Sequence, residues 1–80
     1  MSIQIFIKIL SGKKITLNVD ASDTIETIKS MIQEEQGIRA SDFKLAFAGK
    51  LMENNHTLSD YDIQRTRYNL SFVYRPLEGG

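Results

Sequence analysis

Two runs near the amino terminus alternate apolar side chains with polar or mixed ones. Isoleucine occupies every second position of residues 3–9, and residues 15–19 repeat the alternation with branched apolar side chains. A period of two with many β-branched residues is typical of a strand packed on one face. Because the turn signal Ser11-Gly12 separates the two runs, we predict that they pair as a hairpin.

The period then changes to that of a helix. Isoleucines at helical spacing share one face of residues 25–32. Asp23 or Thr24 is expected to accept hydrogen bonds from the unpaired amides at the helix start. Gly37 follows a charged run and can adopt the left-handed conformation that ends a helix. The sequence therefore predicts one helix between these signals.

The second half of the chain contains shorter signals. In order, these predict a strand at 44–48, a turn at 49–50, a turn at 53–55, a turn-rich connection at 57–63 and a strand at 70–74. The turn at 53–55 depends on Asn54 and Asn55, which tolerate positive backbone φ angles. In the connection, Leu58, Tyr61 and Ile63 are expected to face the core, with the Tyr61 hydroxyl hydrogen-bonded locally.

The order of these elements, strand-strand-helix-strand-strand, predicts an α+β roll. The helix stripe and the inward rows of the strands can bury each other when the helix crosses one face of a sheet. Pro76 ends regular pairing because it lacks an amide hydrogen. Residues 76–80 are therefore expected to form a flexible tail beyond a domain of residues 1–75.

Length and composition fit one small soluble domain. Hydrophobic residues make up 41% of the 80-residue chain and charged residues 25%, enough for one core but not for two domains. Ten basic and ten acidic side chains cancel, which argues against nucleic-acid binding. The amino terminus lacks a signal-peptide pattern, and no stretch reaches the roughly 20 apolar residues of a membrane span. We expect a monomer in the cytosol or nucleus.

Residues that could perform catalysis or hold a cofactor are scarce. The chain contains no cysteine, which excludes a thiol nucleophile, a disulfide and a thiolate metal site. Its single histidine, His56, lies in a polar turn, where a surface role is expected. Ser11-Gly12-Lys13 belongs to a hairpin turn rather than to a strand-to-helix phosphate loop. We therefore predict no enzymatic activity, no metal site and no cofactor.

Several motifs resemble those of the ubiquitin family, in the family's order and spacing. They are QIF-K-L-GK-ITL-V at 4–19, SDTIE at 22–26, L-x-FAGK at 45–50 and TLSDY-x-IQ at 57–64. FAGK and TLSDY-x-IQ together are highly specific, and the resemblance covers nearly the whole chain. It implies the ubiquitin-like β-grasp fold, in which one helix crosses a mixed sheet.

The resemblance implies a protein modifier that is conjugated through its carboxyl end. In the family, ATP-dependent activation of the terminal glycine leads through enzyme thioesters to an isopeptide bond with a lysine. The implied partners are activating, conjugating, ligating and deconjugating enzymes, together with target-protein lysines. The residues involved here would be Arg75, Leu77, Gly79 and Gly80. Two glycines suit a narrow catalytic channel because neither carries a Cβ.

The family's docking patch for receptors maps onto the exposed face of the predicted sheet. Its members here are Leu10, Ala46, Gly49, Ser71 and Val73. Ala46 replaces a larger isoleucine of the family, and losing about three carbons from a buried contact forfeits roughly 2 kcal/mol. Receptors of the family are therefore expected to bind this chain about ten- to hundredfold more weakly.

Four lysines match family positions from which chains of modifiers are built: Lys8, Lys13, Lys29 and Lys50. Lys50, inside FAGK, is the strongest candidate acceptor. Lys29 is expected to lie against the turn near Asn54, where the family has an aspartate, so that an ion pair is lost. For each lysine, a solvated surface charge is the simpler interpretation.

Departures in the tail keep two other functions open. Pro76 has no counterpart in the family's ending, and Glu78 replaces a basic residue, which disfavours enzymes that expect a cation. The chain would then be a non-conjugated interaction domain of a larger protein, with Gly79-Gly80 as part of a linker. A sulfur carrier that forms a thiocarboxylate on Gly80 is the third hypothesis.

Overall fold

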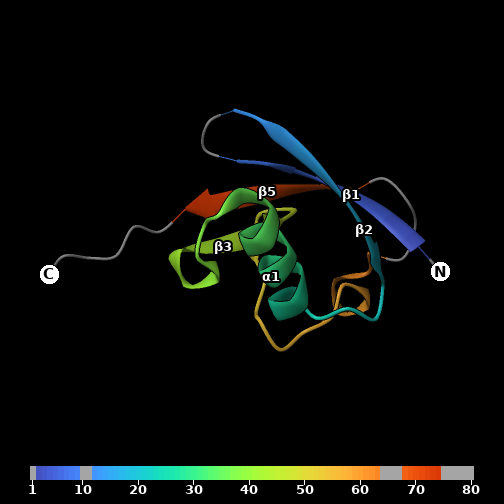
Figure 1. Ribbon diagram of the computed structural model, residues 1–80. Helices are drawn as coiled ribbons and strands as arrows, with labels where there is room; N and C mark the ends of the chain where they lie inside the picture. The colour runs from blue at the N-terminus through green and yellow to red at the C-terminus, as the bar shows by residue number, and fades with distance from the viewer. Residues whose placement is uncertain (1, 10–11, 64–67, 75–80) are drawn as a thin grey trace, which may run out of the picture.

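The protein forms a five-stranded mixed sheet with one helix across a face (Figure 1). The computed structural model describes residues 2–9, 12–63 and 68–74, with the backbone alone for β5. The sheet order is β2-β1-β5-β3-β4. The strands are β1 (Ser2–Lys8), β2 (Lys14–Asp20), β3 (Phe43–Phe47), β4 (Lys50–Leu51) and β5 (Tyr68–Tyr74). The pair β1 and β5 is parallel and the other pairs are antiparallel, so the predicted α+β class with a mixed sheet is confirmed.

Helix α1 (Ile25–Gln36) begins and ends at capping residues. Thr24 is the N-cap, and its hydroxyl oxygen accepts a hydrogen bond from the Thr27 amide at 3.2 Å. Gly37 has a left-handed backbone (φ 71°) and ends the helix. The Asp23 carboxylate instead accepts from the Asp20 amide at 2.9 Å. Of the two N-cap candidates, Thr24 is therefore the residue that the helix uses.

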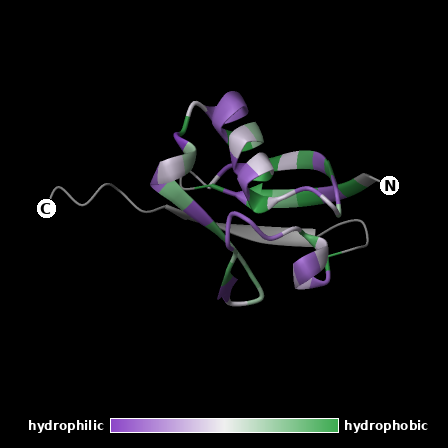
Figure 2. Cartoon of the chain, turned by 90° about the horizontal axis from the view of Figure 1, so that it is seen from below, coloured by the Kyte–Doolittle hydropathy of each residue, from purple (hydrophilic) through white to green (hydrophobic). Residues whose placement is uncertain are grey.

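The core lies between the helix stripe and the inward rows of the strands. Hydrophobic positions recur along β1 and α1 (Figure 2). Three isoleucines of α1 are fully buried, together with the side chains that face them from β1, β3 and the 57–63 connection: Ile25, Ile28, Ile32, Ile3, Ile5, Ile7, Phe43, Leu45, Leu58 and Ile63. The predicted inward positions are thus confirmed, with Tyr61 half-buried against this core.

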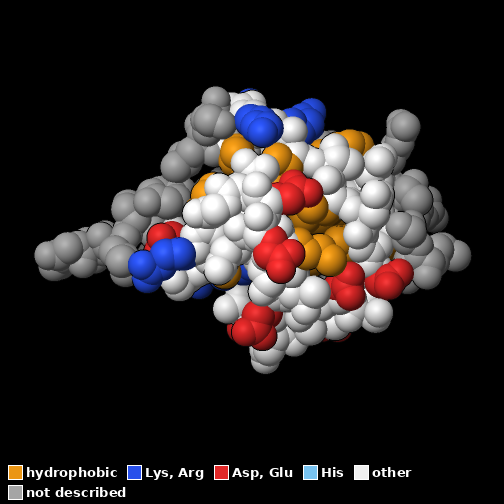
Figure 3. All heavy atoms as spheres, in the orientation of Figure 1, with side chains coloured by type: hydrophobic (Ala, Val, Ile, Leu, Met, Phe, Trp, Pro, Cys, Tyr) orange, Lys and Arg blue, Asp and Glu red, His pale blue; other side chains and the backbone are white. Residues whose placement is uncertain are grey.

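Acidic side chains occupy the outer side of α1. Glu26, Glu34 and Glu35 are all exposed there, and carboxylates gather on this side of the molecule (Figure 3). A helix with an apolar stripe inward and charges outward is stable only when the stripe is covered. One face of the sheet covers the apolar stripe of α1. The other face of the sheet is not covered by α1.

Several predicted details differ from the structure. The strand predicted at 44–48 is β3 at Phe43–Phe47, and Ala48, predicted to be in the strand, lies in the following turn with φ 53°. That turn comprises Ala48-Gly49 rather than Gly49-Lys50, because Lys50 already pairs with Phe47 in β4. Asn54 and Asn55 do form a turn, but neither has the expected positive φ among the described residues.

Three short elements of the structure were not predicted from the sequence. Strand β4 has two residues, and the 3-10 helices η1 (Ala40–Asp42) and η2 (Ser59–Tyr61) have three each. Elements of this length show no hydrophobic period, since a period needs several residues to repeat. β5 begins two residues before the predicted strand at 70–74.

Ile28→Ala should lower the free energy of unfolding by about 2–5 kcal/mol, because it removes a fully buried side chain and leaves a cavity. Urea unfolding followed by circular dichroism measures this loss. The matched control is Glu34→Ala on the exposed side of the same helix, expected to change stability by less than about 0.5 kcal/mol. Equal losses in the two variants would contradict a core built on the helix stripe.

Candidate functional site

The sheet face opposite α1 carries the predicted docking patch. Strand pairing places Ser71 of β5 directly opposite Ala46 of β3. Ala46 is half-buried. Val73 lies two residues beyond Ser71 in β5. Directly opposed residues of a sheet point to the same face. Gly49 is exposed in the turn between β3 and β4. The backbone therefore brings Ala46, Ser71 and Val73 together in the neighbouring strands β3 and β5, with Gly49 in the turn after β3, while Leu10 lies outside the described residues.

Leu51 extends this surface, and the sequence patterns did not predict it as a member of the docking patch. It lies directly opposite Ala46 in β4 and is 53% exposed. Within the described residues it is the large hydrophobic side chain that is exposed. The next residue, Met52, is buried, and because both residues are apolar, no local pattern in the sequence distinguishes the exposed one. Apolar area at Leu51 thus adjoins the small Ala46.

The predicted conjugation residues follow the last strand. β5 ends at Tyr74, which pairs with Phe43 of β3. Arg75, Leu77, Gly79 and Gly80 lie outside the described residues. The proposed division into residues 1–75 and 76–80 therefore stays a prediction.

The four candidate acceptor lysines differ in the solvent exposure of their side chains. Lys8 and Lys50 are exposed at the ends of β1 and β4, and Lys13 is exposed beside the hairpin turn. Lys29 is only 6% exposed. An acceptor amine must reach the active site of another protein, and the structure offers three such amines at the surface.

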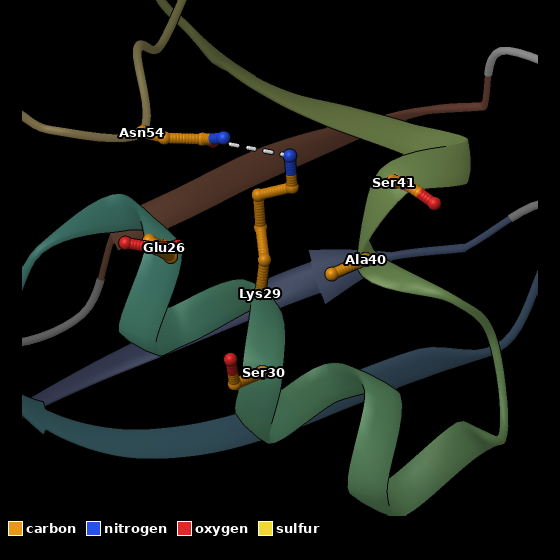
Figure 4. Close-up of a pocket in the computed structure, with 6 residues that line it drawn as sticks. All are labelled: Glu26, Lys29, Ser30, Ala40, Ser41 and Asn54. Carbon is orange, nitrogen blue, oxygen red and sulfur yellow. Dashed lines mark hydrogen bonds between the residues drawn. The ribbon is translucent and has the colours of Figure 1, made fainter.

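Lys29 is held against the turn at Asn54, as predicted. Its Nζ donates a hydrogen bond to Asn54 Oδ1 at 3.1 Å (Figure 4). The same Nζ lies 5.5 Å from the centre of the Phe43 ring. Burial lowers the pKa of Lys29 from its ordinary value of 10.5, Lys44 lowers it further, and Glu26 acts in the opposite direction. A neutral amide and an aromatic face thus stabilise a buried ammonium less well than a carboxylate would.

Backbone hydrogen bonds fix the turn that holds Asn54. The amide of Glu26 donates to the Asn54 carbonyl at 3.1 Å, and the amide of Ile25 donates to the His56 carbonyl at 2.9 Å. The turn therefore satisfies amides at the helix start that lack partners within the helix. The Tyr61 hydroxyl accepts from the Glu53 amide at 2.7 Å, which confirms its predicted local bond.

A polar pocket of about 240 Å³ surrounds the Lys29 side chain. It is lined by Glu26, Lys29, Ser30, Ala40, Ser41 and Asn54. Its walls come from α1, η1 and the turn at Asn54 (Figure 4). The pocket holds one ammonium and one carboxylate, and neither a nucleophile–base pair nor a phosphate-binding loop is among its lining residues.

Metal-ligand clusters and membrane-spanning helices are both absent from the described part of the chain. No group of three or more histidine, aspartate or glutamate side chains there is placed to hold a metal ion. No described helix is long and apolar enough to cross a membrane.

Comparison with known proteins finds one family. The family model described as "Ubiquitin family" matches residues 5–75. Ubiquitin-like protein NEDD8 of Dictyostelium discoideum is 38% identical over 58 residues, which cover 72% of this chain and 75% of that protein. Ubiquitin-like protein 1 of Schizosaccharomyces pombe is 35% identical over 58 residues, covering 72% of this chain and 74% of that protein.

Longer relatives also match. Ubiquitin-like protein 4A of Danio rerio is 34% identical over 70 residues, which cover 88% of this chain but 44% of that protein. The chain thus corresponds to most of some relatives and to less than half of others.

Asn54→Asp should stabilise the protein by about 1 kcal/mol near neutral pH, because a charged partner strengthens the hydrogen bond to Lys29. The folded-state pKa of Lys29 is lowered, so its protonated form costs stability, and this cost disappears as the pH rises toward 10.5. The advantage of the variant should therefore shrink between pH 7 and about pH 10.5. Urea unfolding of both proteins at several pH values measures it.

The control for this prediction is the same substitution in a Lys29→Met background. There the new carboxylate has no ammonium to pair with, and the stabilisation should be absent. A gain that persists in this background, or one that is independent of pH, would contradict the assigned role of Lys29.

Proposed function

Because the chain belongs to the ubiquitin family, we propose that it is a ubiquitin-like modifier joined through Gly80 to lysines of target proteins. The observation that carries the proposal is Gly79-Gly80, preceded by Leu77 and by Arg75, the last residue that the family model matches. The matched relatives of comparable length, among them Ubiquitin-like protein NEDD8 of Dictyostelium discoideum, support it.

The chain's own part in this reaction is to carry an acyl group. Residues 75–80 follow β5, and six extended residues reach about 20 Å. That length lets a carboxylate at Gly80 enter another enzyme's channel while the folded domain stays outside. Activation by ATP, transfer to an enzyme thiol and attack by a lysine amine all occur on partner proteins, so the domain needs no catalytic residue of its own.

The proposed partners follow from the tail and the docking patch. Activating, conjugating, ligating and deconjugating enzymes would bind Arg75, Leu77 and the two glycines. Receptors would contact the sheet face around Ala46, in the cytosol or nucleus. If chains form on this protein, Lys50, Lys8 and Lys13 are the available acceptors, because Lys29 is buried and hydrogen-bonded.

One observation favours a second candidate function. Ubiquitin-like protein 4A of Danio rerio is matched over less than half of its length, so the same domain also occurs inside a longer protein. In that case the chain would act as a non-conjugated interaction domain. A native polypeptide that continues beyond Gly80 and is never cleaved there would favour this candidate over the modifier.

Incubation with ATP and the activating enzymes of its own source should give a covalent adduct of this chain that thiol reductants release. A gel without reductant measures the adduct. The matched control lacks Gly79 and Gly80 and should form none, because the reacting carboxylate is displaced. If no activating enzyme yields an adduct with the full chain, the modifier proposal fails.

A further inference from the structure

The pocket beside α1 contains a buried cation whose hydrogen-bond partner is neutral. The Lys29 side chain extends from α1 toward the turn at Asn54 (Figure 4) and is only 6% exposed. An ammonium group has three N–H donors. Within the described residues, Nζ donates one hydrogen bond, to Asn54 Oδ1, and forms no ion pair. Buried charges are ordinarily paired with an opposite charge, and among these residues the amine has no such counter-ion.

The pocket offers space and further donors next to this amine. Its volume is about 240 Å³, whereas a water molecule occupies about 30 Å³, so there is room for a small organic anion. Asn54 directs its Oδ1 to Lys29, which leaves its Nδ2 as a second donor. Ser30 and Ser41 also line the pocket, and each carries a hydroxyl group that can donate a hydrogen bond.

The charges around the pocket favour an anion with a single negative charge. Burial lowers the pKa of Lys29, and the positive charge of Lys44 lowers it further, so a bound anion would offset both effects. The carboxylate of Glu26 also lines the pocket and raises the pKa of Lys29. A second negative charge on a ligand would be repelled by Glu26. The pocket therefore disfavours a dianion such as hydrogen phosphate.

We propose that this pocket binds a small molecule with one carboxylate group. One oxygen of the carboxylate accepts a hydrogen bond from Lys29 Nζ, and the other accepts from Asn54 Nδ2. Two oxygens on one carbon match two neighbouring donors, which a single chloride ion does not, and hydrogen bonds between charged groups are the strong ones. The rest of the ligand occupies the space lined by Ser30 and Ser41.

This inference goes beyond the proposed function, because conjugation through Gly80 needs no small-molecule site. The pocket lies between α1, η1 and the turn at Asn54, and the docking patch around Ala46 is not part of it. A failed thioester assay leaves the inference standing, and a failed ligand titration leaves the modifier proposal standing.

The probe is sodium acetate, titrated into the ¹⁵N-labelled protein against sodium chloride at constant ionic strength and followed by NMR. We expect saturable shifts at Ser30, Ser41 and Asn54, with a Kd on the order of 10 mM, as one hydrogen-bonded charge pair would give. Acetate at about 0.2 M should then lower the unfolding equilibrium constant about twentyfold relative to chloride. Hydrogen phosphate should bind at least about threefold more weakly than acetate.

Variants assign the groups of the site. Asn54→Asp places a carboxylate of the protein itself beside Lys29 and should abolish acetate binding, as should Lys29→Met, which removes the cation. Glu26→Gln should tighten acetate binding at least about threefold, because it removes the repelling charge. Its matched control, Glu35→Gln, removes the same charge from an exposed position of α1 outside the pocket and should leave the Kd unchanged.

Shifts that grow linearly without saturation, or that persist in both Asn54→Asp and Lys29→Met, would overturn the inference. Tighter binding of hydrogen phosphate than of acetate would overturn it as well, because the pocket would then select a different class of anion. If Lys29→Met does not fold, Asn54→Asp decides the question alone, since Asn54 is exposed in a turn.

Discussion

The structure depends on the burial of one isoleucine stripe against one face of one sheet. Ile25, Ile28 and Ile32 are completely buried, and a helix of 12 residues in isolation would be marginal in water. The sheet in turn needs the helix, since its inward rows would otherwise be exposed. Among the described residues, the buried apolar side chains form one core cluster, as expected for so small a chain.

This single constraint leaves the other sheet face uncovered by α1. The helix covers one face, so the residues between the inward positions of β1 and β3 lie on the other face. Strand β5 lies at the centre of the sheet, where it pairs in parallel with β1. The described residues therefore offer a surface, rather than a catalytic cavity, as the candidate site.

The electrostatics follow the same division. Acidic side chains occupy the outer side of α1, while Lys8, Lys14 and Lys44 occupy the open sheet face. Lys29 differs from these three, because its amine is buried on the helix side with an amide as its partner. The zero net charge therefore includes local groups of like charge, and local charge affects which partners a surface selects.

The strongly periodic parts of the fold could be predicted from the sequence. The hairpin, the helix with Gly37 as its stop, and the inward positions of the strands all depend on patterns that repeat several times. β4 and Leu51 could not be predicted in this way, because their exposure depends on a two-residue pairing with Ala46 and Phe47. Ala48 was misplaced because its backbone conformation is set by the adjoining Gly49 turn.

The candidate site was predictable in outline only. Resemblance of motifs identified Ala46, Ser71 and Val73, and strand register then placed them on one surface. The burial of Phe43 and its contact with the Lys29 amine depend on how the helix sits on β3, which no local pattern encodes.

The most direct test of the central claim is mass spectrometry of proteins linked to this chain in its own cells. The chain would be tagged at its amino end, purified under denaturing conditions and digested with a protease that cleaves after glutamate, since Arg75-Pro76 resists trypsin. Cleavage after Glu78 should leave Gly79-Gly80 on target lysines through an isopeptide bond. Recovery of the tagged chain only in unmodified form, or only within a longer polypeptide, would contradict the account.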